Sequence, residues 1–279
     1  MSKNLFTKIK GLKICYSIHG DGYPVILIHG FGLHKEFWIA QISELANHFK
    51  VISLDNRGSG KSDHPKEPYK LENLADDVKN LMDHLEIQKA HVIGWATGAM
   101  IAQYLVIQYP KRVDKVVLIA ALTKIPVDKS GLEMFKRSQL TFHEEKQKNP
   151  ENAFFSKMKQ RFSRKFYKQL VERPHEKFHG IFNTNDLMDL VFKDTSQPHD
   201  IENRINAIAE LNTIDKIHKI SNEVLVLAGE KDRISPKSVS LELNSKLKRS
   251  KLIIFNGGHY FPLENALEVN NSLINFLKD

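Results

Sequence analysis

The sequence predicts an α/β protein with a mostly parallel sheet and helices on both faces of that sheet. Short, continuously apolar runs alternate along the chain with amphipathic segments, which is the pattern of strands joined by crossover helices. Runs without polar alternation are typical of strands that are buried on both faces. The chain has 279 residues, of which 41% are hydrophobic, so it can bury a large core.

Each element of this fold follows from a local pattern. Strands are expected at 12–18, 25–28, 51–54, 91–93, 116–120, 224–227 and 252–255. Amphipathic helix patterns lie at 37–49, 71–85, 99–108 and 264–277. Right-handed crossovers between successive strands would make the sheet largely parallel.

The alternation stops between about residues 126 and 215, where polar and aromatic stretches carry no strand signal. We expect a helical lid at 126–215, inserted into a core domain formed by 1–125 and 216–279. Part of it has helical spacing, at Phe155, Lys159, Phe162, Phe166 and Leu170. The surrounding basic residues, among them Lys157 and Arg161, are expected to be solvated. Interleaved basic and aromatic residues can also bind single-stranded nucleic acid, but only in a groove that this pattern does not demonstrate.

The sequence GWATG at 94–98 matches a sharp strand-to-helix turn, because it follows the expected strand 91–93 and precedes the expected helix 99–108. In the pattern G-x-S-x-G, two glycines let the chain turn so tightly that the central serine projects above the sheet as a nucleophile. Ala96 stands at that central position. Its methyl group offers no attacking oxygen.

A second glycine-rich segment, HGFG at 29–32, directly follows the expected strand 25–28. A tetrahedral intermediate needs two N–H donors that are already aimed at its oxyanion, and backbone amides supply them without reorganisation. The amides of Phe31 and Thr97 are the expected donors. A purely structural turn would also explain these glycines.

Asp232 and His259 lie on two further loops that follow expected strands, in GEKDRISP at 229–236 and NGGHYFP at 256–262. A carboxylate can orient an imidazole, and the imidazole can move a proton. Each residue alone has an ordinary explanation, because an Asp near a proline is commonly a turn or helix cap and the chain has 13 histidines. The chain order Ala96, Asp232, His259 predicts a catalytic triad without its nucleophile.

These motifs together resemble the α/β-hydrolase superfamily. HGFG followed by Trp38 and by LDNRGSGKS at 54–62 is similar to the branch of small esterases, enol-lactonases, carbon–carbon bond hydrolases and perhydrolase-like enzymes. The resemblance runs from about residue 12 to the C-terminus and is weakest in the lid. It implies the α/β-hydrolase fold with a mostly parallel, eight-stranded sheet, and one catalytic frame that serves many acyl substrates.

The resemblance also implies an enzyme that hydrolyses a small-molecule carboxylic ester or lactone through an acyl-serine intermediate. A serine at position 96 would attack the carbonyl, His259 would act as base, and Asp232 would hold the imidazole. The chain with alanine is expected to be nearly inert, since loss of the nucleophile costs on the order of 10⁶ in kcat. The acyl pocket is expected to contain the following residues, whose aromatic members could equally be core: Gly30, Trp38, Trp95, Tyr260 and Phe261.

Two explanations of Ala96 remain open. Deliberate replacement of a serine in an experimental variant would preserve the pocket while stopping turnover, and the intact Asp232 and His259 motifs favour this explanation. Alternatively, a naturally non-catalytic protein would use the same cavity to bind a ligand. Thr97 is not expected to replace the nucleophile, because its side chain should point away from the site.

Two other motifs suggest different chemistry. His175, Glu176 and His179 match H-E-x-x-H, so a zinc hydrolase is a remote alternative, although Pro174 and Gly180 disfavour a helix there. GSGKS at 58–62 is similar to a phosphate-binding loop, but the full pattern would need glycine at Asp55. We therefore expect no metal and no cofactor.

Charge and cysteine content restrict the partners and the compartment. The formal net charge is +8, but acidic residues are interspersed nearly throughout, so a solvated surface is expected instead of nucleic-acid binding. The N-terminus has no signal-like apolar run, and the longest plain apolar run, 116–122, is too short to span a bilayer. Cys15 is the single cysteine. A cytoplasmic protein that does not bind membranes is expected.

Overall fold

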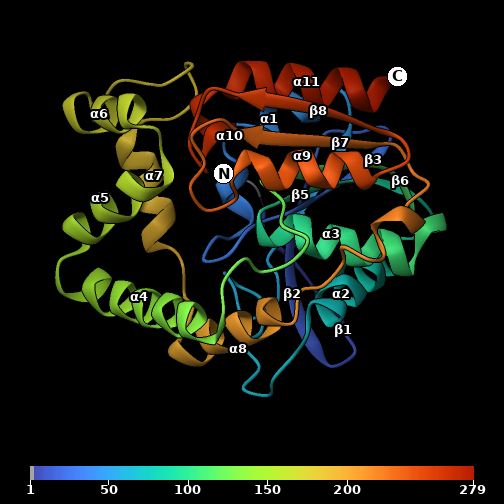
Figure 1. The fold of residues 1–279 in the computed structure, drawn as a ribbon, viewed down its shortest axis with the longest axis horizontal. Coiled ribbons are helices and arrows are strands. Elements are labelled where there is room, and N and C mark those ends of the chain that lie inside the picture. The colour runs from blue at the N-terminus through green and yellow to red at the C-terminus, as the bar shows by residue number, and fades with distance from the viewer. Residues whose placement is uncertain (1–2) are drawn as a thin grey trace.

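The structure is a computed structural model that describes residues 3–279. Its strands are β1 (Leu5–Ile9), β2 (Leu12–His19), β3 (Pro24–Ile28), β4 (Lys50–Leu54), β5 (Ala90–Trp95), β6 (Val113–Ile119), β7 (Val224–Gly229) and β8 (Ser250–Phe255). They form one eight-stranded sheet in the order β1-β2-β4-β3-β5-β6-β7-β8 (Figure 1). β2 pairs antiparallel with β1 and β4, and all other pairings are parallel. The predicted mostly parallel sheet is confirmed.

Helices cover both faces of the sheet. One face packs against α2 (Leu71–His84), α3 (Thr97–Gln108) and α9 (Lys237–Lys246), and the other against α1 (Ile42–Ala46) and α11 (Ala266–Lys278). In Figure 1, the red α11 lies on the opposite side of β7 and β8 from α9 and α3. Every residue of β5 and β7 is buried, because their apolar side chains meet helices on both sides.

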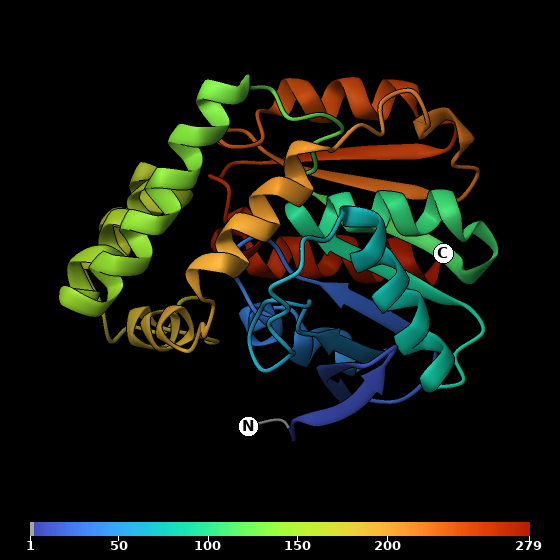
Figure 2. The same cartoon turned by 90° about the horizontal axis from the view of Figure 1, so that it is seen from below.

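The segment between β6 and β7 forms five α-helices. They are α4 (Lys129–Lys148), α5 (Pro150–Arg161), α6 (Arg164–Glu172), α7 (Thr184–Phe192) and α8 (Pro198–Ala209). In both views, α4 and α5 stand at one side of the sheet, whereas α8 brings the chain back along the core (Figures 1 and 2). We call residues 126–215 the helical insertion. Its division from the core as a separate lid domain stays a prediction.

Two predicted helices have different boundaries in the structure. The pattern at 37–49 forms a short 3₁₀ turn, η1 (Lys35–Trp38), which buries Phe37 and Trp38, followed by α1, which buries Leu45. The pattern at 264–277 begins earlier, as α10 (Phe261–Glu264), and continues as α11. Two further 3₁₀ turns, η2 (Pro110–Arg112) and η3 (Ile217–Lys219), lie in connections.

The sequence did not predict β1, because its residues alternate between the buried and the exposed side and form no continuous apolar run. Such alternation is typical of a strand at the edge of a sheet with one solvated face. Cys15 is buried in β2. None of the helices in residues 3–279 has both the length and the apolar character needed to cross a bilayer.

Candidate active site

Ala96 lies on the turn between β5 and α3, with φ 52° and ψ −111°. Such a conformation costs about 1–3 kcal/mol for a residue other than glycine, so the surrounding structure must impose it. The flanking glycines allow it. A Cβ on Gly98 would lie 1.9 Å from the carbonyl oxygen of Ile28, and a Cβ on Gly94 would lie 2.3 Å from that of Gly98. Only glycine at both positions lets α3 begin this close to β3 and β5.

The imidazole of His259 pairs with the carboxylate of Asp232. Both side chains are buried, and His259 Nδ1 lies 2.8 Å from Asp232 Oδ2. Because a carboxylate only accepts hydrogen bonds, Nδ1 is the donor in this pair and Nε2 is the ring nitrogen that does not face Asp232. The other carboxylate oxygen accepts the amides of Ile234 and Ser235 at 2.8 and 2.9 Å. Burial raises the pKa of Asp232, but His259 and these hydrogen bonds outweigh burial and hold that pKa below its usual value.

The loop that carries the imidazole is hydrogen-bonded to the helical insertion. The Tyr260 amide donates to the carbonyl oxygen of Arg161 at 3.0 Å. The Glu264 carboxylate accepts both the Gly258 amide, at 2.7 Å, and the Ser163 amide, at 2.9 Å. The α5–α6 junction therefore fixes the backbone on both sides of the imidazole.

Two backbone amides are available at the same end of the sheet. Within residues 3–279, neither the Phe31 amide nor the Thr97 amide donates a hydrogen bond to another protein group. Both residues line a cavity together with Ala96 and His259. A Cβ on Gly30 would lie only 3.3 Å from the Cβ of Ala96, so glycine keeps this position open. Unpaired amides beside a cavity suit an acceptor that carries negative charge.

The cavity has a volume of about 210 Å³ and a mainly apolar wall. Residues from the loops at the end of the sheet form one side, which we call the floor: Gly30, Phe31, Ala96, Thr97 and His259. Residues from the helical insertion form the other side, which we call the roof: Val127, Leu132, Phe135, Arg161 and Ile208. The floor therefore contains every predicted catalytic and oxyanion residue except Asp232, which lies behind His259.

A family model described as the alpha/beta hydrolase fold matches residues 23–266, which is most of the chain. The chain belongs to the α/β-hydrolase family. This membership confirms the resemblance that the glycine-rich motifs predicted. It does not by itself assign a substrate, because members of one fold family share a frame and differ in their sites.

Individual relatives of this α/β hydrolase match most of its length. It is similar to the AB hydrolase superfamily protein YisY of Bacillus subtilis, with 27% identity over 275 residues that cover 92% of each protein. The enol-lactonase from Burkholderia xenovorans LB400 has a similar fold, with a TM-score of 0.83, 20% identity, and coverage of 99% of this chain and 100% of that chain.

A third similar protein is the meta-cleavage product hydrolase CumD from Pseudomonas fluorescens IP01, whose structure is that of a serine-to-alanine mutant complexed with acetates. Its TM-score is 0.74 and its identity 25%, with coverage of 98% of this chain and 97% of that chain.

The residues predicted for the acyl pocket separate into two groups. Gly30, Trp95 and Tyr260 line the cavity, whereas Trp38 and Phe261 do not. Trp38 is fully buried behind Trp95, with ring centroids 5.6 Å apart. Phe261 stacks on a phenylalanine at the end of β8. The prediction is therefore corrected for Trp38 and Phe261, which pack in the core behind the wall.

Arg161 lines the cavity, although its side chain was expected to be among the solvated charges. The predicted helical stripe from Phe155 to Leu170 is wrong, because α5 ends at Arg161 and α6 begins anew with Ser163 as its cap. The buried face of α5 contains Phe154 and Met158 instead. Arg161 follows Met158 by three residues and so continues this face, which is the signal that could have identified it.

The zinc alternative lacks the geometry that it requires. α6 ends at Glu172, and the segment with His175, Glu176 and His179 is a turn, so the two imidazoles do not share one face of a helix. His179 Nε2 lies 3.0 Å from the carbonyl oxygen of Glu264, and His175 is exposed. These residues do not fit a zinc ion.

A cluster within residues 3–279 brings together potential metal ligands from His34, Glu36 and Asp55. The ammonium group of Lys35 already forms ion pairs with both carboxylates of this cluster. Asp55 also accepts the amides of Lys35 and Lys61 at 2.7 and 2.9 Å. The loop at 58–62 is therefore organised around a carboxylate of the chain itself, in place of a bound phosphate.

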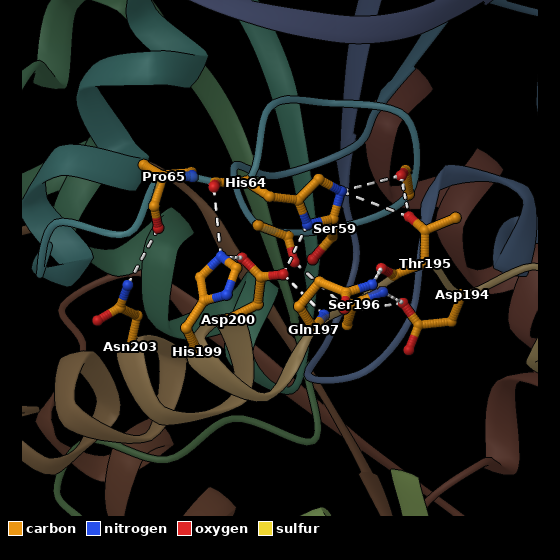
Figure 3. Close-up of polar contacts among 12 residues, drawn as sticks. Ser59, His64, Pro65, Asp194, Thr195, Ser196, Gln197, His199, Asp200 and Asn203 are labelled. Carbon is orange, nitrogen blue, oxygen red and sulfur yellow. Dashed lines mark hydrogen bonds and ion pairs between the residues drawn. The ribbon is translucent and has the colours of Figure 1, made fainter. Parts of the chain in front are cut away.

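Another polar cluster joins the helical insertion to the loop after β4 (Figure 3). Asp200, in the first turn of α8, accepts hydrogen bonds from His64 Nδ1 at 2.6 Å and from the Gln197 amide at 2.8 Å. The bond to Asp200 raises the pKa of His64. Asn203 donates to the carbonyl oxygen of Pro65 at 3.1 Å. This cluster holds α8, and with it one edge of the roof, against the core.

Proposed function

We propose that the protein is a serine-type hydrolase of small carboxylic esters or lactones in a form that lacks its nucleophile. One observation carries this proposal: the His259–Asp232 pair and two free amides open onto the cavity that also contains the strained turn at Ala96. The mainly apolar wall suits an acyl chain, and the floor suits a developing oxyanion.

The active form would carry serine at position 96. The serine hydroxyl attacks the carbonyl carbon while His259 Nε2 takes its proton, and the oxyanion accepts hydrogen bonds from the Phe31 and Thr97 amides. Collapse of this intermediate expels the alcohol, which takes the proton from His259. Water then attacks the acyl enzyme with His259 again as base, and the acid is released. Asp232 stabilises the imidazolium that forms in each step.

With Ala96 the first step has no nucleophile, so the chain is expected to be catalytically dead. We propose that alanine replaces a serine deliberately. The costly backbone conformation at Ala96 and the complete His259–Asp232 pair support this explanation, because both suit a nucleophile that is no longer there. The similar CumD structure is an example of the same type of replacement.

A second candidate is a naturally non-catalytic protein that binds a ligand in the same cavity. The observation that favours it is Ala96 itself, since the residue leaves the cavity formed but inert. This candidate differs from the first only in what a serine at position 96 would do.

The decisive experiment compares three proteins: the chain itself, Ala96→Ser, and Ala96→Ser with His259→Ala. Each is incubated with short-chain aryl esters and with lactones, and product release is followed. Turnover that appears with serine and disappears in the double variant supports the hydrolase. Ligand binding without turnover in any of the three proteins would overturn it and favour the binding protein.

A further inference from the structure

Arg161 is the one permanently charged side chain among the cavity-lining residues of the described chain. Its Nε atom is buried and has no hydrogen-bond partner. Within residues 3–279, its guanidinium group forms no ion pair with an Asp or Glu and donates no hydrogen bond. Arg161 as a whole is half-buried, so the cost falls on Nε, a charged donor that is shielded from water and lacks an acceptor.

The positive charge of Arg161 also lowers the pKa of a neighbouring lysine. Burial, and then the charge of Arg161, lower the pKa of Lys157 to about 7. The Lys157 ammonium lies 4.4 Å from the ring centroid of Phe142 on the same helical insertion. The end of α5 therefore carries positive charge, and no carboxylate within residues 3–279 lies at ion-pair distance from Arg161.

Arg161 is also close to the reacting position. Its carbonyl oxygen accepts the Tyr260 amide at 3.0 Å, and a Cβ on Gly258 would lie 2.5 Å from the same oxygen. The backbone of Arg161 thus packs against the loop that carries His259. An anion bound by its guanidinium group would share the cavity with the acyl group that His259 serves.

We propose that Arg161 binds a carboxylate of the substrate, so that the substrate is an ester or lactone whose acyl part carries a second, free carboxylate. Half-esters of short dicarboxylic acids are the simplest members of this class. The proposal rests on the hydrolase function proposed above. The carboxylate belongs to the acyl part because that part stays in the cavity through both steps, whereas the alcohol leaves after the first. An Arg–carboxylate pair is also frequently bidentate, which would orient the acyl chain.

The first test measures binding to the chain as it exists, in which the proposed function expects no turnover that would disturb the measurement. Monomethyl glutarate and dimethyl glutarate form a matched pair that differs in one carboxylate, and calorimetric titration gives both affinities. The proposal is supported if the parent chain binds the monoester more tightly than the diester. In Arg161→Gln, the affinity for the monoester should fall by about tenfold or more, and the affinity for the diester should stay unchanged. Lys159→Gln is the control, because it removes one exposed positive charge from the same helix and should change neither affinity.

Two outcomes of this titration would overturn the assignment. One is equal affinity for the two esters in the parent chain. The other is an equal loss of both affinities in Arg161→Gln, which indicates a general effect on the cavity. Arg161→Lys separates charge from geometry, since it keeps the charge but cannot form the bidentate pair, and it should recover only part of the affinity. Circular dichroism of each variant establishes that it is folded.

The second test repeats the comparison in Ala96→Ser and measures kcat/KM for the same two esters. Both proposals are supported if the monoester is hydrolysed preferentially and if Arg161→Gln abolishes this preference. Equal kcat/KM for the two esters would overturn the role of Arg161 and leave the hydrolase supported. Selective binding of the monoester without any turnover would overturn the hydrolase and support the carboxylate site. An equal loss of kcat for both esters in Arg161→Gln would assign Arg161 to the oxyanion and overturn the substrate class.

Discussion

The floor and the roof of the cavity are built by different means. Floor residues follow the carboxyl ends of β3, β5 and β8, and glycines without room for a Cβ hold their backbone. Roof residues come from helices α4, α5 and α8 and from the segment before α4, and the insertion is joined to the core by polar clusters such as that around Asp200. If the proposed function is correct, the reaction chemistry depends on the backbone of the floor, whereas selectivity depends on side chains of the roof.

The largest effect should come from the support of the floor imidazole. In the Ala96→Ser background, Asp232→Asn is expected to lower kcat by about 10⁴, because the amide stabilises the wrong tautomer of His259. Steady-state kinetics on an aryl ester measure it. Glu230→Gln, on the same loop but exposed, is the control and should leave kcat nearly unchanged. A loss below about tenfold for Asp232→Asn would remove Asp232 from the catalytic frame.

A methyl group added at Gly98, next to the floor, should destabilise the protein more than one added at Gly180 in the insertion. Gly98→Ala places a Cβ 1.9 Å from a carbonyl oxygen, so the free energy of unfolding should fall by more than about 3 kcal/mol. A Cβ on Gly180 would meet no atom within 4 Å. Gly180→Ala should therefore lower the free energy of unfolding by only about 1 kcal/mol, because of its positive φ of 73°. Urea unfolding of both variants measures the difference. Equal losses would contradict the view that the floor is the more constrained region.

Lys157, on α5 beside the roof, should make the stability of the protein depend on pH. Lys157 is a base whose pKa falls to about 7 on folding, from about 10.4 when unfolded. Its charged form therefore destabilises the folded state, fully below pH 7 and progressively less as pH rises towards 10.

Lys157→Met should consequently stabilise the protein more at pH 6 than at pH 10, by about 1–3 kcal/mol in the free energy of unfolding. Chemical denaturation at both pH values measures this difference. Lys159→Met, exposed on the same helix, should show no comparable pH dependence. A gain for Lys157→Met that is independent of pH would argue that the amine is solvated in the folded protein.

The smallest effect concerns the turn itself. Ala96→Gly should raise the free energy of unfolding by about 1 kcal/mol, because glycine adopts the positive φ without strain. Ala99→Gly, three residues later within α3, should instead lose about 1 kcal/mol or more. Thermal unfolding of the two variants compares them. A loss of stability in Ala96→Gly would show that the turn holds no strain.

The same difference between regions determines what could be predicted from the sequence. The floor was predicted in place because G-x-A-x-G and HGFG leave a characteristic pattern in adjacent residues. Arg161 was misinterpreted because its exposure depends on where α5 ends, and Ser163 sets that end through a cap that the aromatic spacing concealed. Trp38 and Phe261 were misplaced because an apolar ring beside a glycine motif can equally line a wall or support it from behind. Edge strand β1 was missed because its pattern alternates.

The shared carboxylate of Glu264 has a consequence for how molecules reach the cavity. It ties Gly258 and Ser163 together, so any displacement of the α5–α6 junction would carry the imidazole out of alignment. Within residues 3–279, α4 makes no hydrogen bond to the floor, although Leu132 and Phe135 lie over it. A movement confined to α4 would therefore leave the His259–Asp232 pair aligned, whereas a movement of the α5–α6 junction would not.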